Sequence, residues 1–164
     1  MEDCRTRYPL LLVHGLNCRD DWIFSYWGPL TDHLRARGAA VYLSGQDAWG
    51  SVPGNARALL RRAEDILTET GSEKLNLLAH SKGGLEARYL ISTLGFAPKA
   101  ASLTTICTPH RGSKAAAEWL ARERVCRLIG PGLEGFWRAR GDRDPDFQAA
   151  VSALTPEAMA RFNQ

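Results

Sequence analysis

The sequence predicts a doubly wound α/β fold, in which a mostly parallel sheet carries helices on both faces. Short apolar runs alternate four times with stretches of helical periodicity over the first 110 residues. The first of these apolar runs, at residues 8–13, is continuously apolar, as in a strand that is buried on both faces of a parallel sheet. The three helical stretches end at Gly38, Gly71 and Gly95, and glycine favours the left-handed turn that follows a helix. Such alternation is typical of parallel sheets covered by helices.

The predicted strands are the apolar runs at residues 8–13, 39–43, 75–79 and 102–107. The predicted helices are the periodic stretches at residues 27–37, 55–70 and 82–94. Asn55 is expected to cap the second helix, because its side chain can accept a hydrogen bond from a free N–H of the first turn. Residues 1–110 are therefore expected to form the core of the domain.

Residues 111–164 are expected to be helical or irregular and to belong to the same domain. Ser113 is expected to cap a helix that runs to about Val125. A stretch rich in glycine and proline at residues 130–135 is expected to break the helical pattern. Two further short helices are expected at Asp144-Pro145 and Thr155-Pro156, where proline suits a helix start.

The composition is that of an ordinary globular protein. Apolar residues make up 45% of the chain and charged residues 24%, which excludes disordered, collagen-like and coiled-coil proteins. The net charge of +3 is too small to predict a nucleic-acid partner. No C-x-x-C pair is present among the four cysteines, so zinc and thioredoxin-type sites are not expected. Cys107 ends an apolar run and is expected in the core.

The N-terminal region predicts a cytoplasmic protein. Its longest aliphatic run is residues 10–13, which is far shorter than a membrane span or the core of a signal peptide. Residues 111–143 are the most basic part of the chain, with eight basic and four acidic residues. The simplest interpretation is a solvated helical face. The alternative is a surface with Trp119 and Trp137 that makes transient contact with anionic lipid.

The third predicted strand runs through Ala79-His80-Ser81-Lys82-Gly83 directly into a helix. This is the arrangement of a nucleophile elbow, in which a tight turn exposes a serine oxygen above the sheet. Small residues two positions before and after the serine are required, because they press against neighbouring elements. The helix that follows directs its free N–H groups at a forming oxyanion. The alternative is a serine that merely caps a helix in a non-catalytic domain.

The first predicted strand ends in His14-Gly15-Leu16. An oxyanion hole in this architecture takes one N–H from the residue after the serine, here Lys82, and one from the loop after an adjacent strand. Leu16 is placed to supply the second N–H. The alternative is a plain glycine turn at the end of a strand.

With these motifs the chain resembles the bacterial triacylglycerol lipases of the α/β-hydrolase superfamily. The resemblance rests on residues 8–15, 73–89 and 101–113, and more weakly on residues 160–163. It implies hydrolysis of carboxylic esters of lipids, with Ser81 as nucleophile and the Leu16 and Lys82 amides as oxyanion hole. It also implies that the segment after Ser113 is a helical lid region, and that the strand order is second, first, third, fourth.

A serine nucleophile needs a histidine base and an acid, usually in the order Ser, Asp or Glu, His. No histidine follows His110, which lies in a segment that the family uses structurally. The alternative is that His110 itself acts as the base, because a triad is defined by geometry and not by chain order. His14 and His80 are expected to support the site rather than to take a proton, and His33 is expected to be exposed. Three acidic residues follow but lie too early in the chain and too close to the lid region to be the acid of a triad: Asp142, Asp144 and Asp146.

The resemblance thus implies a hydrolase truncated before its acid and base. The family's calcium-site aspartates would lie in the absent part, so no metal and no cofactor are expected. The alternative function is a catalytically inactive module that binds a lipid or a protein partner. The strand at residues 102–107 would lie at an open edge of the sheet, where its unpaired backbone groups predict self-association.

Overall fold

The computed structural model describes residues 3–20 and 26–164. Four parallel strands form one sheet in the order β2-β1-β3-β4, which confirms the predicted topology. The strands are β1 (Leu10–Val13), β2 (Val41–Leu43), β3 (Leu75–His80) and β4 (Ala100–Ile106). In register, Leu12 of β1 pairs with Leu43 on one side and Leu78 on the other. The central position of β1 and β3 explains why most of their residues are apolar.

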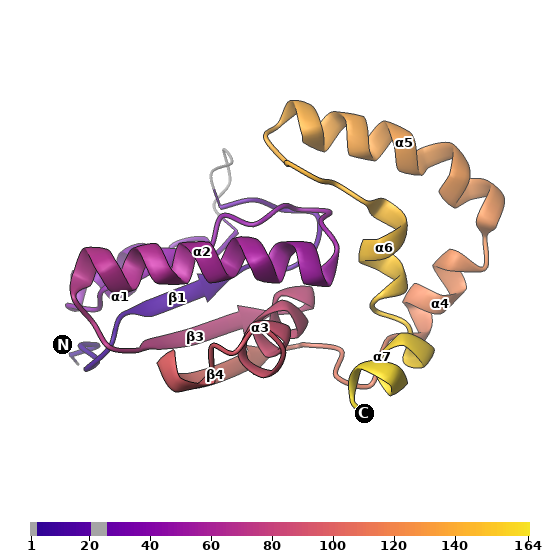
Figure 1. The fold of residues 1–164 in the computed structure, drawn as a ribbon. Coiled ribbons are helices and arrows are strands. Elements are labelled where there is room, and N and C mark those ends of the chain that lie inside the picture. Colours follow the sequence, from indigo (N-terminus) through magenta and orange to yellow (C-terminus); the bar gives the residue numbers. More distant parts are fainter. Residues whose placement is uncertain (1–2, 21–25) are drawn as a thin grey trace.

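Helices cover both faces of the sheet, as predicted (Figure 1). On one face, α2 (Val52–Thr70) and α3 (Lys82–Ser92) bury a cluster that includes Leu11 and Val13 of β1. On the other face, Leu12 packs with the side chain of Leu34 from α1 (Leu30–Ala36). Alternate residues of β1 thus face opposite layers, because successive side chains of a strand point to opposite sides.

The starts of three helices differ from the sequence predictions. The helix expected to open at Asp144-Pro145 begins at Phe147, with Asp146 as its cap. Ser51, not Asn55, caps α2, and its hydroxyl accepts a hydrogen bond from the Gly54 N–H at 3.2 Å. A proline in the first turn favours this earlier start, so Asn55 lies inside the helix and is buried. The helix expected from residue 27 begins at Leu30 instead, after a turn in which Gly28 has a positive φ of 52°.

β4 lies at the edge of the sheet, and much of it is exposed. Cys107, which follows this strand directly, is exposed as well, with a φ of 51°. The prediction that Cys107 lies in the core was wrong. An apolar run predicts burial only where both faces of the strand are covered, and an edge strand lacks a neighbour on one side.

Beyond residue 112 the chain forms the four helices α4 (Lys114–Leu120), α5 (Glu123–Ala139), α6 (Phe147–Ser152) and α7 (Pro156–Phe162). Ser113 caps α4 as predicted, but that helix ends at Leu120 rather than near Val125. The predicted break at residues 130–135 is also wrong, since α5 continues through it with Pro131 inside the helix. A Cβ on Gly130 would lie 3.4 Å from Phe147, so tertiary packing overrides the low helix propensity of this stretch.

The helices α4, α5 and α6 form an arch beyond the carboxyl ends of the strands, with α5 far from the sheet (Figure 1). An apolar cluster joins this arch to the loop before α2, where Trp49 stacks against Phe147 with ring centroids 5.0 Å apart. Asp142, buried, accepts hydrogen bonds from the backbone N–H groups of Ala48 and Trp49, both at 3.1 Å. The arch is thus fixed to the sheet domain after α5.

No helix among the described residues is long and apolar enough to cross a membrane.

Candidate active site

Ser81 stands at the sharp turn between β3 and α3. Its φ of 53° and ψ of −127° lie in a region that non-glycine residues avoid, and such a conformation costs about 1–3 kcal/mol. The N–H of Ser81 donates to the Ile106 carbonyl at 2.9 Å, which holds the turn against the end of β4. The Ser81 side chain makes no capping hydrogen bond to α3, so the alternative of a simple helix-capping serine is wrong.

Glycines let three segments meet around this serine. A Cβ on Gly83 would lie 2.3 Å from the His14 carbonyl oxygen, and one on Gly84 would lie 2.0 Å from Oγ1 of Thr108. A Cβ on Gly15 would lie 2.9 Å from Cβ of Ser81. Each distance is too short for a side chain. The start of α3 therefore packs directly against the backbone of the loop after β1 and against the Thr108 side chain of the loop after β4.

The predicted oxyanion-hole residues lie on two of these segments. Leu16 directly follows Gly15 in the loop after β1, and Lys82 is the first residue of α3. The loop turns back at Asn17, whose φ is 63° and whose N–H donates to the Ala48 carbonyl at 3.1 Å. The Leu16 side chain packs against the apolar cluster of the helical arch. The arch thus contacts the site through Leu16.

A buried network of polar side chains lies behind the turn. Its members are His14, Gln46, Asn55, Lys82 and Glu86. Nζ of Lys82 forms a buried ion pair with Oε1 of Glu86. Sequence reasoning missed three of these residues. The spacing of four residues between Lys82 and Glu86 was the one available signal, because such pairs face each other on a helix.

Tyr26 is a further residue that sequence reasoning missed. Its hydroxyl is hydrogen-bonded to Nδ1 of His80 and would lie 2.7 Å from a Cβ on Gly15. Burial raises the pKa of Tyr26; a hydrogen bond from the Gly15 backbone lowers it, and the nearby Cys18 and Asp20 raise it again. With its pKa raised, Tyr26 keeps its proton at neutral pH. His80 is thereby tied to the loop after β1, in accord with its predicted supporting role.

His110 is also held by structural contacts. Its Nε2 lies 3.0 Å from Oγ1 of Thr105, and its Nδ1 lies 3.2 Å from a guanidinium nitrogen of Arg88. Asn163 donates to its carbonyl at 2.8 Å. Both ring nitrogens thus have partners within the fold. His33 is exposed on α1, as predicted.

Both ring nitrogens of His14 face carbonyl oxygens, of Gly15 at 2.8 Å and of Gln46 at 3.2 Å. The acids of the segment after α5 also have structural contacts: Asp142 binds the loop before α2, and Asp146 caps α6. Among the described residues, no three His, Cys, Asp or Glu side chains gather as a metal site would require.

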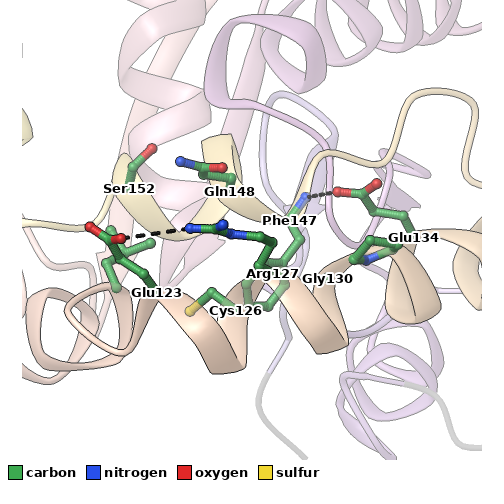
Figure 2. A pocket seen from close by; sticks show the side chains of 10 residues that line it. Glu123, Cys126, Arg127, Gly130, Glu134, Phe147, Gln148 and Ser152 are labelled. Carbon is green, nitrogen blue, oxygen red and sulfur yellow. Dashed lines mark hydrogen bonds and ion pairs between the residues drawn. The ribbon is translucent and has the colours of Figure 1, made fainter.

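A cavity of about 550 Å³ lies in the helical arch, between α5 and α6 (Figure 2). Arg127 and Glu123 form an ion pair at 3.8 Å on its wall, and Glu134 accepts a hydrogen bond from the Phe147 N–H at 2.9 Å. Ser81, Leu16 and Lys82 do not line this cavity. It is therefore separate from the turn that carries the candidate chemistry.

Comparison with known proteins identifies relatives of the whole chain. It is 43% identical over 97% of its length to a triacylglycerol lipase of Pseudarthrobacter phenanthrenivorans, covering 54% of that protein. It is likewise 43% identical over 97% of its length to a triacylglycerol lipase of Burkholderia plantarii, covering 48% of it. The chain thus spans about half the length of these curated relatives. No protein-family model matches the sequence.

Solved structures show the same fold. A Bacillus licheniformis lipase superposes with a TM-score of 0.73 at 19% identity, over 95% of this chain and 58% of that one. A Staphylococcus hyicus lipase superposes with a TM-score of 0.72 at 18% identity, over 100% of this chain and 64% of that one. The chain is a relative of the bacterial triacylglycerol lipases and has their α/β-hydrolase fold.

Proposed function

We propose that Ser81 is the nucleophile of a lipase-type serine hydrolase that cleaves carboxylic esters of lipids such as triacylglycerols. The strained conformation of Ser81 between β3 and α3 is the observation that carries this proposal. Folds retain such strain where it serves a function, here the exposure of a side-chain oxygen at the carboxyl end of the sheet. The names of the relatives support lipid esters as the substrate class.

In the proposed reaction, Oγ of Ser81 attacks the ester carbonyl carbon and its proton passes to solvent water. The carbonyl oxygen becomes an oxyanion, which the N–H groups of Leu16 and Lys82 stabilise. Collapse of this intermediate breaks the ester bond, and the alcohol leaves with a proton. Water then attacks the acyl-enzyme and releases the carboxylic acid and the free serine. We assign the role of the base to none of the described histidines.

Labelling with a fluorophosphonate probe tests the nucleophile, because the reagent requires an activated serine. We expect one label on the native chain and none on Ser81→Ala. Ser92→Ala is the matched control, since Ser92 lies on the exposed side of the same helix and should leave labelling unchanged. Hydrolysis of a short-chain nitrophenyl ester should fall by several orders of magnitude in Ser81→Ala. Labelling or activity that survives in this variant would contradict the proposal.

A second candidate function is a catalytically inactive module that binds a lipid or a protein partner. The engaged ring nitrogens of His14 and His110 favour it, because a serine without a base is a weak nucleophile. A chain that binds a fluorescent fatty acid but is not labelled by the fluorophosphonate would support this alternative. Labelling of Ser81 would exclude it.

We further propose that residues 111–164 form a lid-like segment of the same domain as residues 1–110, and that this segment contacts lipid surfaces. Trp119 on α4 and Leu128 on α5 support the contact, with exposed fractions of 46% and 81%. The segment that carries both residues, 111–143, has eight basic and four acidic residues, and its helices α4 and α5 belong to an arch that projects from the sheet (Figure 1). Leu128→Glu should reduce co-sedimentation with anionic vesicles, whereas Thr68→Glu on α2 should not. Equal binding by both variants would contradict a contact through α5.

We also propose that the open edge at β4 allows the chain to self-associate. β4 pairs with β3 on one side, and no described strand pairs with its other side. Exposed backbone N–H and C=O groups of an edge strand can pair with another chain. The support is the predominantly exposed pattern along β4.

A further inference from the structure

The buried polar network behind Ser81 connects the two halves of the proposed oxyanion hole. We propose that Glu86 is a positioning residue of this site. Its carboxylate fixes the loop that carries the Leu16 amide relative to the start of α3, which carries the Lys82 amide. This inference rests on the proposed function, because the spacing of the two amides matters only where an oxyanion forms between them.

Glu86 receives donors from three different elements. Oε1 is ion-paired with Nζ of Lys82 on α3 and accepts a hydrogen bond from Nδ2 of Asn55 on α2 at 2.9 Å. Oε2 accepts a hydrogen bond from Nε2 of Gln46, in the loop after β2, at 3.1 Å. The side chains of Lys82 and Glu86 are only 1% and 2% exposed. A carboxylate buried this completely requires an ionic partner and hydrogen bonds to both oxygens.

Gln46 carries the network on to the loop after β1. The side-chain Nε2 of Gln46 also donates to the backbone carbonyl oxygen of His14 at 3.0 Å. The backbone carbonyl oxygen of Gln46 lies 3.2 Å from Nε2 of His14. The two hydrogens of the Gln46 amide thus serve two acceptors, so a flipped amide would place oxygen against oxygen. The His14 peptide, which directly precedes Gly15-Leu16, is thereby tied to Glu86.

The role of this network is geometric rather than electrostatic. Lys82 and Glu86 carry opposite charges in contact, so the pair adds little net field at Ser81. Oxyanion donors, by contrast, must stand within about 2.7–3.1 Å of the developing charge, and displacement by roughly half an ångström is enough to lose the productive geometry. A chain of contacts from α3 through Glu86 and Gln46 to His14 limits such displacement.

Three variants separate positioning from stability. Glu86→Gln removes the charge that holds Lys82, and Gln46→Met removes the link to His14. The double variant Lys82→Met/Glu86→Leu replaces the buried pair by apolar groups, a change that is often neutral or stabilising, and it keeps the backbone N–H of residue 82. Leu90→Ala is the control, since it destabilises α3 by leaving a cavity in the apolar cluster and removes no contact of the polar network.

Two readouts are measured on each variant: the backbone amide resonances of Leu16 and Lys82 by NMR, and the rate at which a fluorophosphonate labels Ser81. We expect Glu86→Gln to shift both resonances and to slow labelling on the order of tenfold or more. Gln46→Met should shift the Leu16 resonance and slow labelling similarly. The double variant should be thermally more stable than Glu86→Gln, while its labelling stays slow. Leu90→Ala should lose thermal stability, while its Leu16 amide resonance stays in place.

Recovery of both stability and labelling rate in the double variant would overturn the proposal, because Glu86 would then be merely structural. An unmoved Leu16 resonance in Glu86→Gln would overturn it as well. If the native chain is not labelled at all, the proposed function fails for this chain. The two resonances still decide in that case whether Glu86 couples the loop after β1 to α3.

Discussion

A Cβ on Gly83 would stand 2.3 Å from the carbonyl oxygen of His14, well inside van der Waals contact. The helix after the nucleophile turn can therefore approach β1 only with glycine at this position. The contact brings the start of α3 next to the loop that carries Leu16. Gly83 thus allows the start of α3, which carries Lys82, to lie against the loop that carries Leu16.

Gly83→Val should consequently prevent correct folding or lower the free energy of unfolding by about 3 kcal/mol or more. Gly132→Ala on α5 is the matched control, because nothing lies within 4 Å of its added Cβ and alanine favours a helix by up to about 1 kcal/mol over glycine. Thermal unfolding followed by circular dichroism measures both. A soluble Gly83→Val protein of native stability would mean that the elbow is not formed.

Asp142 should hold the helical arch against the sheet domain. Its carboxylate accepts hydrogen bonds from the backbone N–H groups of Ala48 and Trp49. It also forms an ion pair with Arg19 at 3.0 Å. Asp142→Asn replaces one of the two accepting carboxylate oxygens by an NH₂ group, which can only donate. We therefore expect the free energy of unfolding to fall by about 2 kcal/mol. Cleavage by a protease within residues 113–141 should accelerate. Asp144→Asn, at an exposed site two residues on, should be cleaved like the native chain; equal rates for both variants would argue against the anchor.

Tyr26 should make stability depend on alkaline pH. Its pKa is raised in the folded chain, first by burial, so the folded state holds this proton more tightly than the unfolded state does. The stabilisation is fully present below the ordinary tyrosine pKa of about 10 and is lost as the pH rises through the raised value.

Tyr26→Phe should therefore flatten the decline in unfolding free energy between about pH 9 and pH 11. Denaturant titrations at successive pH values measure this decline. Tyr8→Phe, which removes a tyrosine at the opposite end of β1, is the control. A Tyr26→Phe variant that declines as steeply as the native chain would contradict the assigned direction.

The edge at β4 should govern the association state. We expect the native chain to sediment as species larger than its 18.1 kDa monomer at micromolar concentration. Thr104→Lys places a charge on the exposed edge strand, which disfavours pairing between chains, and should shift the distribution toward monomer. Thr68→Lys on α2 changes the net charge by the same amount and should leave the distribution of species unchanged. A native chain that is a clean monomer would contradict self-association.

The local pattern of the sequence determined the sheet and the turn. Central strands such as β1 and β3 require mostly apolar residues, and a turn as tight as that at Ser81 requires small neighbours such as Ala79 and Gly83. Both requirements act within a few residues, so they leave a readable pattern. The strand order followed from the family resemblance, and the structure confirms it.

Only the tertiary structure decided which residues are covered and which partners they meet. Cys107 is exposed because β4 has no strand on its outer side, and α5 continues through Pro131 because it packs against α6. Tyr26 and Gln46 reach the site from loops distant in sequence from Ser81, with no motif around them. Burial and long-range hydrogen bonds depend on what lies opposite a side chain in space, and the spacing of residues along one chain carries no record of that.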